Sequence, residues 1–167
     1  TAGLMPASIG HVVAPTFSDL RGTIFEGVTG LLNVIPKEMI DDYNKSHFEL
    51  RLVNGTLIRG FSSEVPDRLR GPQCHWLWGD EMAAWSYLDD MLANIDFSTR
   101  LVYTHKDGRR IQPQRVYTTT PRPLEVLRDL AEDPEVFQVR GSLYENKDNL
   151  AETFVADVAK HEGTKLG

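Results

Sequence analysis

Residues 74–85 read CHWLWGDEMAAW, a short and largely apolar run that ends in two adjacent carboxylates. The apolar part has no 3.6-residue stripe, which is consistent with a strand buried on both faces of a parallel sheet. Ligands of open α/β sheets bind beyond the carboxyl ends of the strands. Burying two acids is costly unless they meet a metal, hydrogen-bond donors or water. We therefore expect Asp80 and Glu81 to lie at a functional site at such an edge.

The composition indicates an ordinary globular protein. A chain of 167 residues suits one domain with a hydrophobic core, and 41% hydrophobic and 25% charged residues are typical values. The formal charge of -6, without a basic tail or stripe, argues against tight nucleic-acid binding by this chain alone. Cys74 is the only cysteine, which excludes an internal disulfide and a thiolate cluster. No apolar run approaches the roughly 20 residues of a membrane helix, and no signal peptide is recognisable.

The first half of the chain predicts a strand, a helix and a hairpin. Residues 11–14 form a short apolar strand that stops at Pro15. A helix capped by Ser18 or Asp19 should follow. Its apolar positions at helical spacing are Leu20, Ile24, Val28, Leu31 and Leu32. Segments 48–53 and 56–61 flank Asn-Gly, the favoured pair of a type I′ turn, and predict a β-hairpin.

The second half predicts further strands alternating with helices. A polar connector over 62–73 leads into the strand that begins at Cys74 and ends at the two acids. An amphipathic helix follows, with Trp85, Leu88, Met91, Leu92 and Ile95 on its apolar side. The remaining segments are a basic loop (104–113), a β-branched strand (115–120), a helix (124–130), a strand (136–143) and a last helix (149–161). This alternation predicts an α/β domain with a mostly parallel sheet flanked by helices.

The acid pair has the chemistry of a nucleotide-hydrolysing site. Asp80 can hold Mg²⁺, usually through water, because magnesium prefers oxygen ligands and keeps much of its hydration shell. Glu81 can orient and deprotonate the water that attacks a γ-phosphate. In the alternative interpretation both acids simply begin the following helix, where negative charge is favourable. The pair alone does not decide between the two.

Threonines form a second candidate group. Thr118, Thr119 and Thr120 end a strand, and their hydroxyls can sense a γ-phosphate by hydrogen bonding. Taken alone, the triplet is better explained by β-propensity before a strand-ending proline.

Two arginines on the polar connector form a third group. Arg68 or Arg70 can neutralise transition-state charge in the manner of an arginine finger. Taken singly, a salt bridge to Glu64 or Asp67 is the simpler interpretation.

Other conspicuous residues have structural explanations. Trp76, Trp78 and Trp85 are expected in the core. Cys74 and His75 are adjacent on a strand and point to opposite faces, so they form no metal or nucleophile pair. The basic loop at 104–113 is more typical of a solvated loop than of a DNA contact.

Taken together, these blocks resemble the ATPase domain of the large terminase subunit of tailed bacteriophages, the motor that packs and cuts viral DNA. The resemblance covers the chain from about His11 to the end and depends on the order and spacing of the blocks. They are Val13–Thr16, Glu26–Leu32, Pro66–Gln73, Trp78–Trp85, Thr118–Pro123, Arg140–Asn146 and Glu162–Gly167.

The resemblance implies a P-loop NTPase fold of the additional-strand, catalytic-glutamate type, with ATP and Mg²⁺ as cofactors. Asp80 matches the Walker B aspartate that binds magnesium, and Glu81 the catalytic glutamate. Residues 118–120 match the coupling motif that links hydrolysis to movement. Arg70 falls where the family has an arginine finger that acts on a neighbouring subunit, and Arg68 is second for that role.

Two parts of the family pattern are absent from these residues. No Gly-Lys-Ser/Thr phosphate loop (Walker A) occurs, and no nuclease domain follows. Residues 1–167 are therefore expected to be a partial ATPase domain. In this fold the strand that leads into the Walker A loop lies inside the sheet. Without that strand, its neighbours lose a hydrogen-bonding partner, and the open edge of the sheet tends to associate with another chain. We expect this chain by itself to hydrolyse ATP negligibly and to oligomerise.

The same resemblance implies double-stranded DNA, the portal of the procapsid and the small terminase subunit as partners, and a homo-oligomeric ring in the cytoplasm of the bacterial host, transiently at the portal. Two alternatives stay open. One is another nucleic-acid-dependent ATPase, such as a helicase with an Asp-Glu box. The other is a non-catalytic α/β interaction module that has lost nucleotide binding.

Overall fold

A six-stranded sheet organises the computed structural model, which describes residues 5–141, 145 and 152–160. The chain divides into two compact units, Thr1–Leu124 and Glu125–Gly167. The sheet belongs to the first unit, and its strand order is β2-β3-β4-β1-β5-β8. That both units form one partial ATPase domain stays a prediction.

The strands of the sheet run in mostly parallel fashion. They are β1 (Ile9–Ala14), β2 (Ile40–Asn44), β3 (Glu49–Leu52), β4 (Leu57–Ser62), β5 (Trp76–Gly79) and β8 (Gln114–Tyr117). Strand β1 pairs in parallel with β4 and β5, and β5 pairs in parallel with β8. Strands β2, β3 and β4 form an antiparallel meander. The apolar run before the two acids is therefore an interior parallel strand, as its composition predicts.

Helical segments connect these strands. They are α1 (Phe17–Asp19), η1 (Leu20–Phe25), α2 (Leu31–Val34), η2 (Lys37–Met39), η3 (Pro66–Leu69), η4 (Met82–Ala84) and α3 (Leu88–Ser98). The second unit contains α4 (Glu125–Glu132) and α5 (Glu152–Ala159). Within the described ranges, none of these helices has the length and apolar character needed to cross a membrane.

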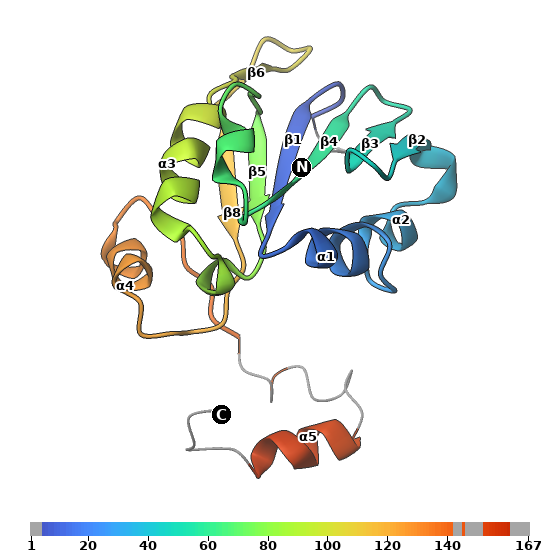
Figure 1. Cartoon of the computed structure of the whole chain (residues 1–167). Helices are drawn as coiled ribbons and strands as arrows, with labels where there is room; N and C mark the ends of the chain where they lie inside the picture. The colour runs from blue at the N-terminus through green and yellow to red at the C-terminus, as the bar shows by residue number, and fades with distance from the viewer. Residues whose placement is uncertain (1–4, 142–144, 146–151, 161–167) are drawn as a thin grey trace. The chain divides into compact units, whose positions relative to one another are not determined.

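Two apolar layers cover the sheet. On one face, Val12 and Ile58 belong to a buried cluster with Leu20 and Phe25, which come from the helical turns after β1. On the other face, α3 packs against η3. Figure 1 shows α1 and α3 on opposite sides of the central strands β1 and β5. The parallel strands thus lie between helices, and in sheets of this kind ligands bind at the carboxyl ends of the strands.

The predicted helix after β1 starts earlier and ends sooner than the apolar spacing suggests. Its N-cap is Thr16, not Ser18 or Asp19. The Thr16 hydroxyl oxygen accepts from the backbone N–H of Asp19, and the Asp19 carboxylate accepts from the backbone N–H of Thr16. The helix ends at Phe25, so Val28 is 93% exposed. A short separate helix, α2, carries Leu31. The glycines between the two helices explain the break, since glycine disfavours a helical interior.

The hairpin over residues 48–61 is confirmed, but its turn differs from the predicted one. Leu52 donates its backbone N–H to Thr56 O at 2.9 Å, which leaves a three-residue loop. Only Gly55 in this loop has a positive φ, +83°, whereas a type I′ turn needs two such residues. The sequence also gave no indication of β2, which extends the sheet beyond the hairpin.

Predictions for the second half are mostly confirmed. Helix α4 lies where the pattern places it, and α5 lies within the predicted last helix. Helix α3 begins at Leu88, so Trp85 precedes it and is not part of its apolar side. Strand β8 ends at Tyr117, so Thr118, Thr119 and Thr120 follow the strand and do not end it as predicted. The basic loop is a small hairpin of β6 (Tyr103–Thr104) and β7 (Arg110–Ile111). The strand predicted over 136–143 is wrong for residues 136–141, which are irregular, and its last residues lie outside the described ranges. Phe137 there is 91% exposed, so the apolar pattern does not mark a buried strand.

Close packing between β1 and β5 leads to a stability prediction at Gly10. A Cβ at this position would lie 2.0 Å from a ring carbon of Trp76, whose indole N–H donates to Ser8 Oγ at 3.1 Å. Because that rigid ring cannot move away freely, Gly10→Ala should lower the free energy of unfolding by about 1–3 kcal/mol. Urea unfolding of the chain measures this. Gly22→Ala, which meets no atom within 4 Å, is the matched control and should cost less.

Candidate active site

The two acids follow the interior strand β5 directly. The backbone N–H of Asp80 donates to Val13 O of β1 at 2.8 Å, which continues the parallel ladder by one residue. Glu81 then has a left-handed backbone, with φ 45° and ψ 52°. A positive φ is uncommon outside glycine and turns the chain sharply out of the strand. Both side chains are half-buried at the carboxyl edge of the sheet.

The threonine triplet lies against these acids. Thr118 Oγ1 donates to Asp80 Oδ1 at 2.7 Å. Thr120 Oγ1 donates to Glu81 Oε1 at 2.5 Å, and its backbone N–H approaches the same oxygen at 3.3 Å. Thr119 Oγ1 accepts from the backbone N–H of Ala83 at 3.0 Å. The structure therefore brings the first and second candidate groups together, because β5 and β8 are parallel neighbours that end at one edge.

Tryptophan indoles hold this arrangement in place. Trp78 donates to Thr118 Oγ1 at 3.3 Å, and Trp85 donates to the backbone carbonyl of Asp80 at 2.8 Å. Trp85 is buried, as expected for the core, but Trp76 and Trp78 are only half-buried. The sequence gave one signal for this positioning role, the position of these tryptophans on both sides of the acids.

A serine after β4 also fixes the loops around the acids. Ser63 Oγ donates to Pro15 O at 2.8 Å and accepts from the backbone N–H of Ser86 at 3.1 Å. It thereby ties the ends of β1 and β4 to the segment that follows the acids. Nothing in the sequence pattern singled out this residue.

The oxygen atoms at this edge suit one particular kind of metal. Within the described ranges, no group of three or more His, Cys, Asp or Glu side chains is arranged to hold an ion. Asp80 offers one carboxylate with the Thr118 hydroxyl beside it. Such a set fits Mg²⁺, which keeps several waters and binds through one or two carboxylates together with substrate phosphates.

Neither arginine of the third group contacts the acids within this chain. Arg70 Nε lies 3.2 Å from Asp67 Oδ1 and donates to Asn94 Oδ1 at 3.3 Å, so the predicted salt bridge is present. Arg68 instead places its guanidinium 5.5 Å above the ring of Phe17. A role of either arginine toward a neighbouring subunit stays a prediction.

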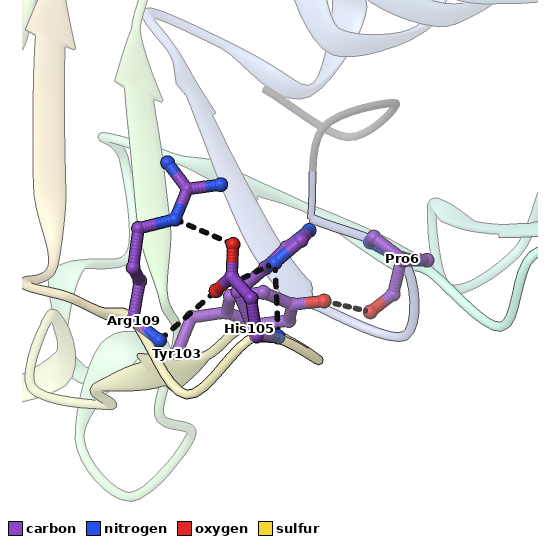
Figure 2. Close-up of polar contacts among 5 residues, drawn as sticks. Pro6, Tyr103, His105 and Arg109 are labelled. Carbon is purple, nitrogen blue, oxygen red and sulfur yellow. Dashed lines mark hydrogen bonds and ion pairs between the residues drawn. The ribbon is translucent and has the colours of Figure 1, made fainter.

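The basic hairpin of β6 and β7 lies away from this site. It precedes β8 in the chain and therefore sits at the amino edge of the sheet, where Tyr103 donates to Pro6 O at 2.9 Å (Figure 2). Asp107 pairs with His105 and Arg109, and the Arg109 backbone N–H is the main cause that lowers the pKa of Asp107 to about 2. Asp107 thus pairs with two of the basic side chains of this loop.

The cysteine and histidine before the acids have separate surroundings. Cys74 is buried beside Thr99, and burial raises the pKa of its thiol. His75 Nδ1 accepts from the backbone N–H of Ile9 at 2.9 Å. The two adjacent side chains thus have different partners, Thr99 for Cys74 and the Ile9 backbone for His75.

Comparison with known proteins gives matches at the level of structure. No family model and no curated protein matches the sequence. The ATPase domain of the large terminase of Thermus phage P74-26 is similar over 75% of this chain and 52% of its own, at 21% identity and TM-score 0.46. The large terminase of a thermophilic bacteriophage, solved in complex with ADP, is similar over 99% of this chain at 12% identity and TM-score 0.65.

This chain spans about half of the first of these structures and 40% of the second. The match to the terminase solved with ADP extends over nearly the whole of this chain, including its mostly parallel sheet and the flanking helices. The chain therefore has the P-loop NTPase-like fold of the matching part of that phage large terminase.

Proposed function

We propose that this chain is part of the ATP-hydrolysing motor of a phage terminase large subunit, which drives viral DNA into procapsids. The observation that carries the proposal is the pairing of Asp80 with Thr118 and of Glu81 with Thr120 across the carboxyl ends of two parallel strands. The fold supports it, since a large terminase with that fold was solved with ADP.

The acids have distinct tasks in this proposal. Asp80 holds Mg²⁺, which supplies charge neutralisation at the β- and γ-phosphates. Glu81 accepts the proton of the attacking water and orients it. The Oε1 atom of Glu81 already accepts two hydrogen bonds from Thr120, and Oε2 is the oxygen left for water.

The phosphate loop must come from polypeptide outside these 167 residues, since the sequence contains no Gly-Lys-Ser/Thr. The outer edge of β8 is the place where its strand fits. Strand β8 pairs with β5 alone among the described strands, and Val116 on it is 57% exposed. A parallel strand added there would end beside the acids and threonines and deliver its loop to them.

The threonines suggest how hydrolysis is communicated. The Glu81 carboxylate accepts a hydrogen bond from the Thr120 hydroxyl. An attacking water that binds Glu81 would compete with this hydrogen bond. Breaking and remaking the bond would move the segment from Thr118 to Pro121, which leads directly into the second unit. DNA, the portal, the small subunit and a ring of copies are the partners on which such movement would act.

Calorimetry with Mg-ATP tests the proposal. The protein used is the natural reading frame, including whatever precedes Thr1. We expect micromolar binding that depends on Mg²⁺, and Asp80→Asn should weaken it about tenfold or more, because one metal ligand loses its charge. Asp41→Asn, at an exposed site on β2, is the matched control and should bind as the wild type does. Absence of binding would favour a non-catalytic interaction module.

A further inference from the structure

A hollow lies beside the first helical turns, and neither Asp80 nor Glu81 lines it. Its volume is about 540 Å³. Its lining side chains come from three parts of the chain that are far apart in sequence: Phe17, Ser18 and Arg21, then Ser46 and Phe48, then Arg68. The sequence patterns gave no indication of it.

Two arginines in this hollow lie over aromatic rings. The guanidinium carbon of Arg21 is 5.6 Å from the centre of the Phe48 ring, and that of Arg68 is 5.5 Å from the Phe17 ring. The two rings stack on each other at 6.3 Å. A guanidinium that rests its face on a ring keeps its N–H donors at the edge, where they can reach a ligand.

Donors outnumber acceptors around these arginines. Arg21 Nε lies 3.9 Å from Glu26 Oε1, which is a long distance for an ion pair. The same oxygen also accepts from the Tyr43 hydroxyl at 3.3 Å. Arg68 has no carboxylate within 4 Å in the described part of the chain. The nearby Glu64 accepts from the backbone N–H of Phe17 at 3.0 Å and is not paired with Arg68. This surplus of positive charge fits an anion.

Two residues that line this hollow, Arg21 and Phe48, have unusual backbone conformations. Arg21 lies on η1, a π-helix of six residues, whereas π-helices are rare and recur at functional sites. Phe48 has φ +52°, an outlier for a bulky residue. Such strain is typical of ligand-binding positions, and here it places an arginine and the ring beneath it.

We propose that this hollow binds phosphate groups. Two guanidiniums can each contact phosphate oxygens in bidentate fashion, and the hydroxyls of Ser18 and Ser46 add donors. The phosphates come from a nucleic-acid backbone or from a free nucleotide. Because the chain carries a net charge of -6, attraction depends on this local charge and not on the whole molecule. The proposal goes beyond the hydrolytic site and does not need Asp80.

Binding measurements on the full chain distinguish the two sources. One arm titrates a short fluorescein-labelled DNA duplex and follows its anisotropy at several salt concentrations. The other arm titrates ATP by calorimetry without magnesium. Arg68→Gln and Arg21→Gln should each weaken the relevant ligand about tenfold, and in the DNA arm each should reduce the salt slope by about one.

A matched control shows whether a loss of binding is specific to this hollow. Arg51→Gln removes an exposed arginine of β3 that lies outside the hollow and should leave binding unchanged. A loss confined to the DNA arm identifies a nucleic-acid backbone as the ligand, and a loss in the ATP arm identifies a nucleotide. The proposal is overturned if neither probe binds, or if both arginine variants bind as the wild type does while their circular dichroism shows a folded chain.

Discussion

Glu81→Gln should reduce ATP turnover by the natural protein roughly 100- to 10,000-fold, the usual contribution of a positioned general base. Glutamine has the same shape and keeps an oxygen for the Thr120 hydroxyl, which donates to Glu81 at 2.5 Å. It cannot take up the proton of the attacking water. The loss should therefore appear in turnover, and the affinity for Mg-ATP should stay close to that of the wild type.

The steady-state rate of phosphate release from ATP measures this effect. The protein used is expressed from the complete natural reading frame. Glu38→Gln is the matched control, because it neutralises an exposed glutamate of η2, away from the acids. Turnover that survives Glu81→Gln undiminished would contradict the role of Glu81. Loss of Mg-ATP binding in the same variant would instead assign the carboxylate to nucleotide binding.

The second large effect concerns acid stability and His11. This imidazole is completely buried on β1, and its ring lies 4.7 Å from that of Phe61. Burial, with a smaller contribution from the charge of Arg59, lowers the pKa of His11 from 6.5 to about 3. The folded protein therefore keeps His11 neutral at a pH where the unfolded chain takes up a proton.

The sign of the pH dependence follows from this difference. Above pH 6.5 neither state is protonated, and the stability is fully present. Between pH 6.5 and about 3 only the unfolded state binds the proton, so the free energy of unfolding falls by about 1.4 kcal/mol per pH unit from this residue. The total is on the order of 5 kcal/mol, a large share of the stability of a small domain.

His11→Leu isolates the contribution of this residue. Urea unfolding at pH 7, 6 and 5 should show a shallower acid loss in the variant than in the wild type. At pH 7 the variant should be at least as stable, because neither ring nitrogen of His11 has a hydrogen-bond partner within the described chain. His47→Leu, at an exposed position, is the control and should keep the wild-type slope. Parallel curves for His11→Leu and wild type would show that His11 titrates normally.

Local patterns predicted the parts of the fold that depend on local rules. The apolar run before Asp80 was consistent with a strand buried inside a sheet, and β5 is an interior strand. The Asn-Gly pair located the hairpin, although the turn geometry depends on how Leu52 pairs with Thr56. Because parallel neighbours end at one edge, the meeting of Asp80 with Thr118 could also be anticipated.

What the sequence did not reveal depends on contacts between distant segments. The stacking of Phe17 on Phe48 joins residues that no periodicity relates, so the phosphate hollow had no sequence signal. The π-helix that carries Arg21 is closed by an i+5 backbone bond from Glu26 N–H to Arg21 O, and apolar spacing does not encode such a bond. The strand predicted after residue 136 failed because β-propensity says nothing of whether a partner strand is present.

The two borders of the sheet have opposite characters, with a consequence for assembly. Strand β2 presents Asp41 and Asp42 to solvent beside an irregularity in its register, and both features discourage a further strand. Strand β8 has a regular register with β5 and no acidic residue, its one charged residue is Arg115, and Val116 is exposed on it. We therefore expect a further strand, from this polypeptide or from another molecule, to pair with β8, which the threonines follow. The acidic edge strand β2 disfavours such pairing.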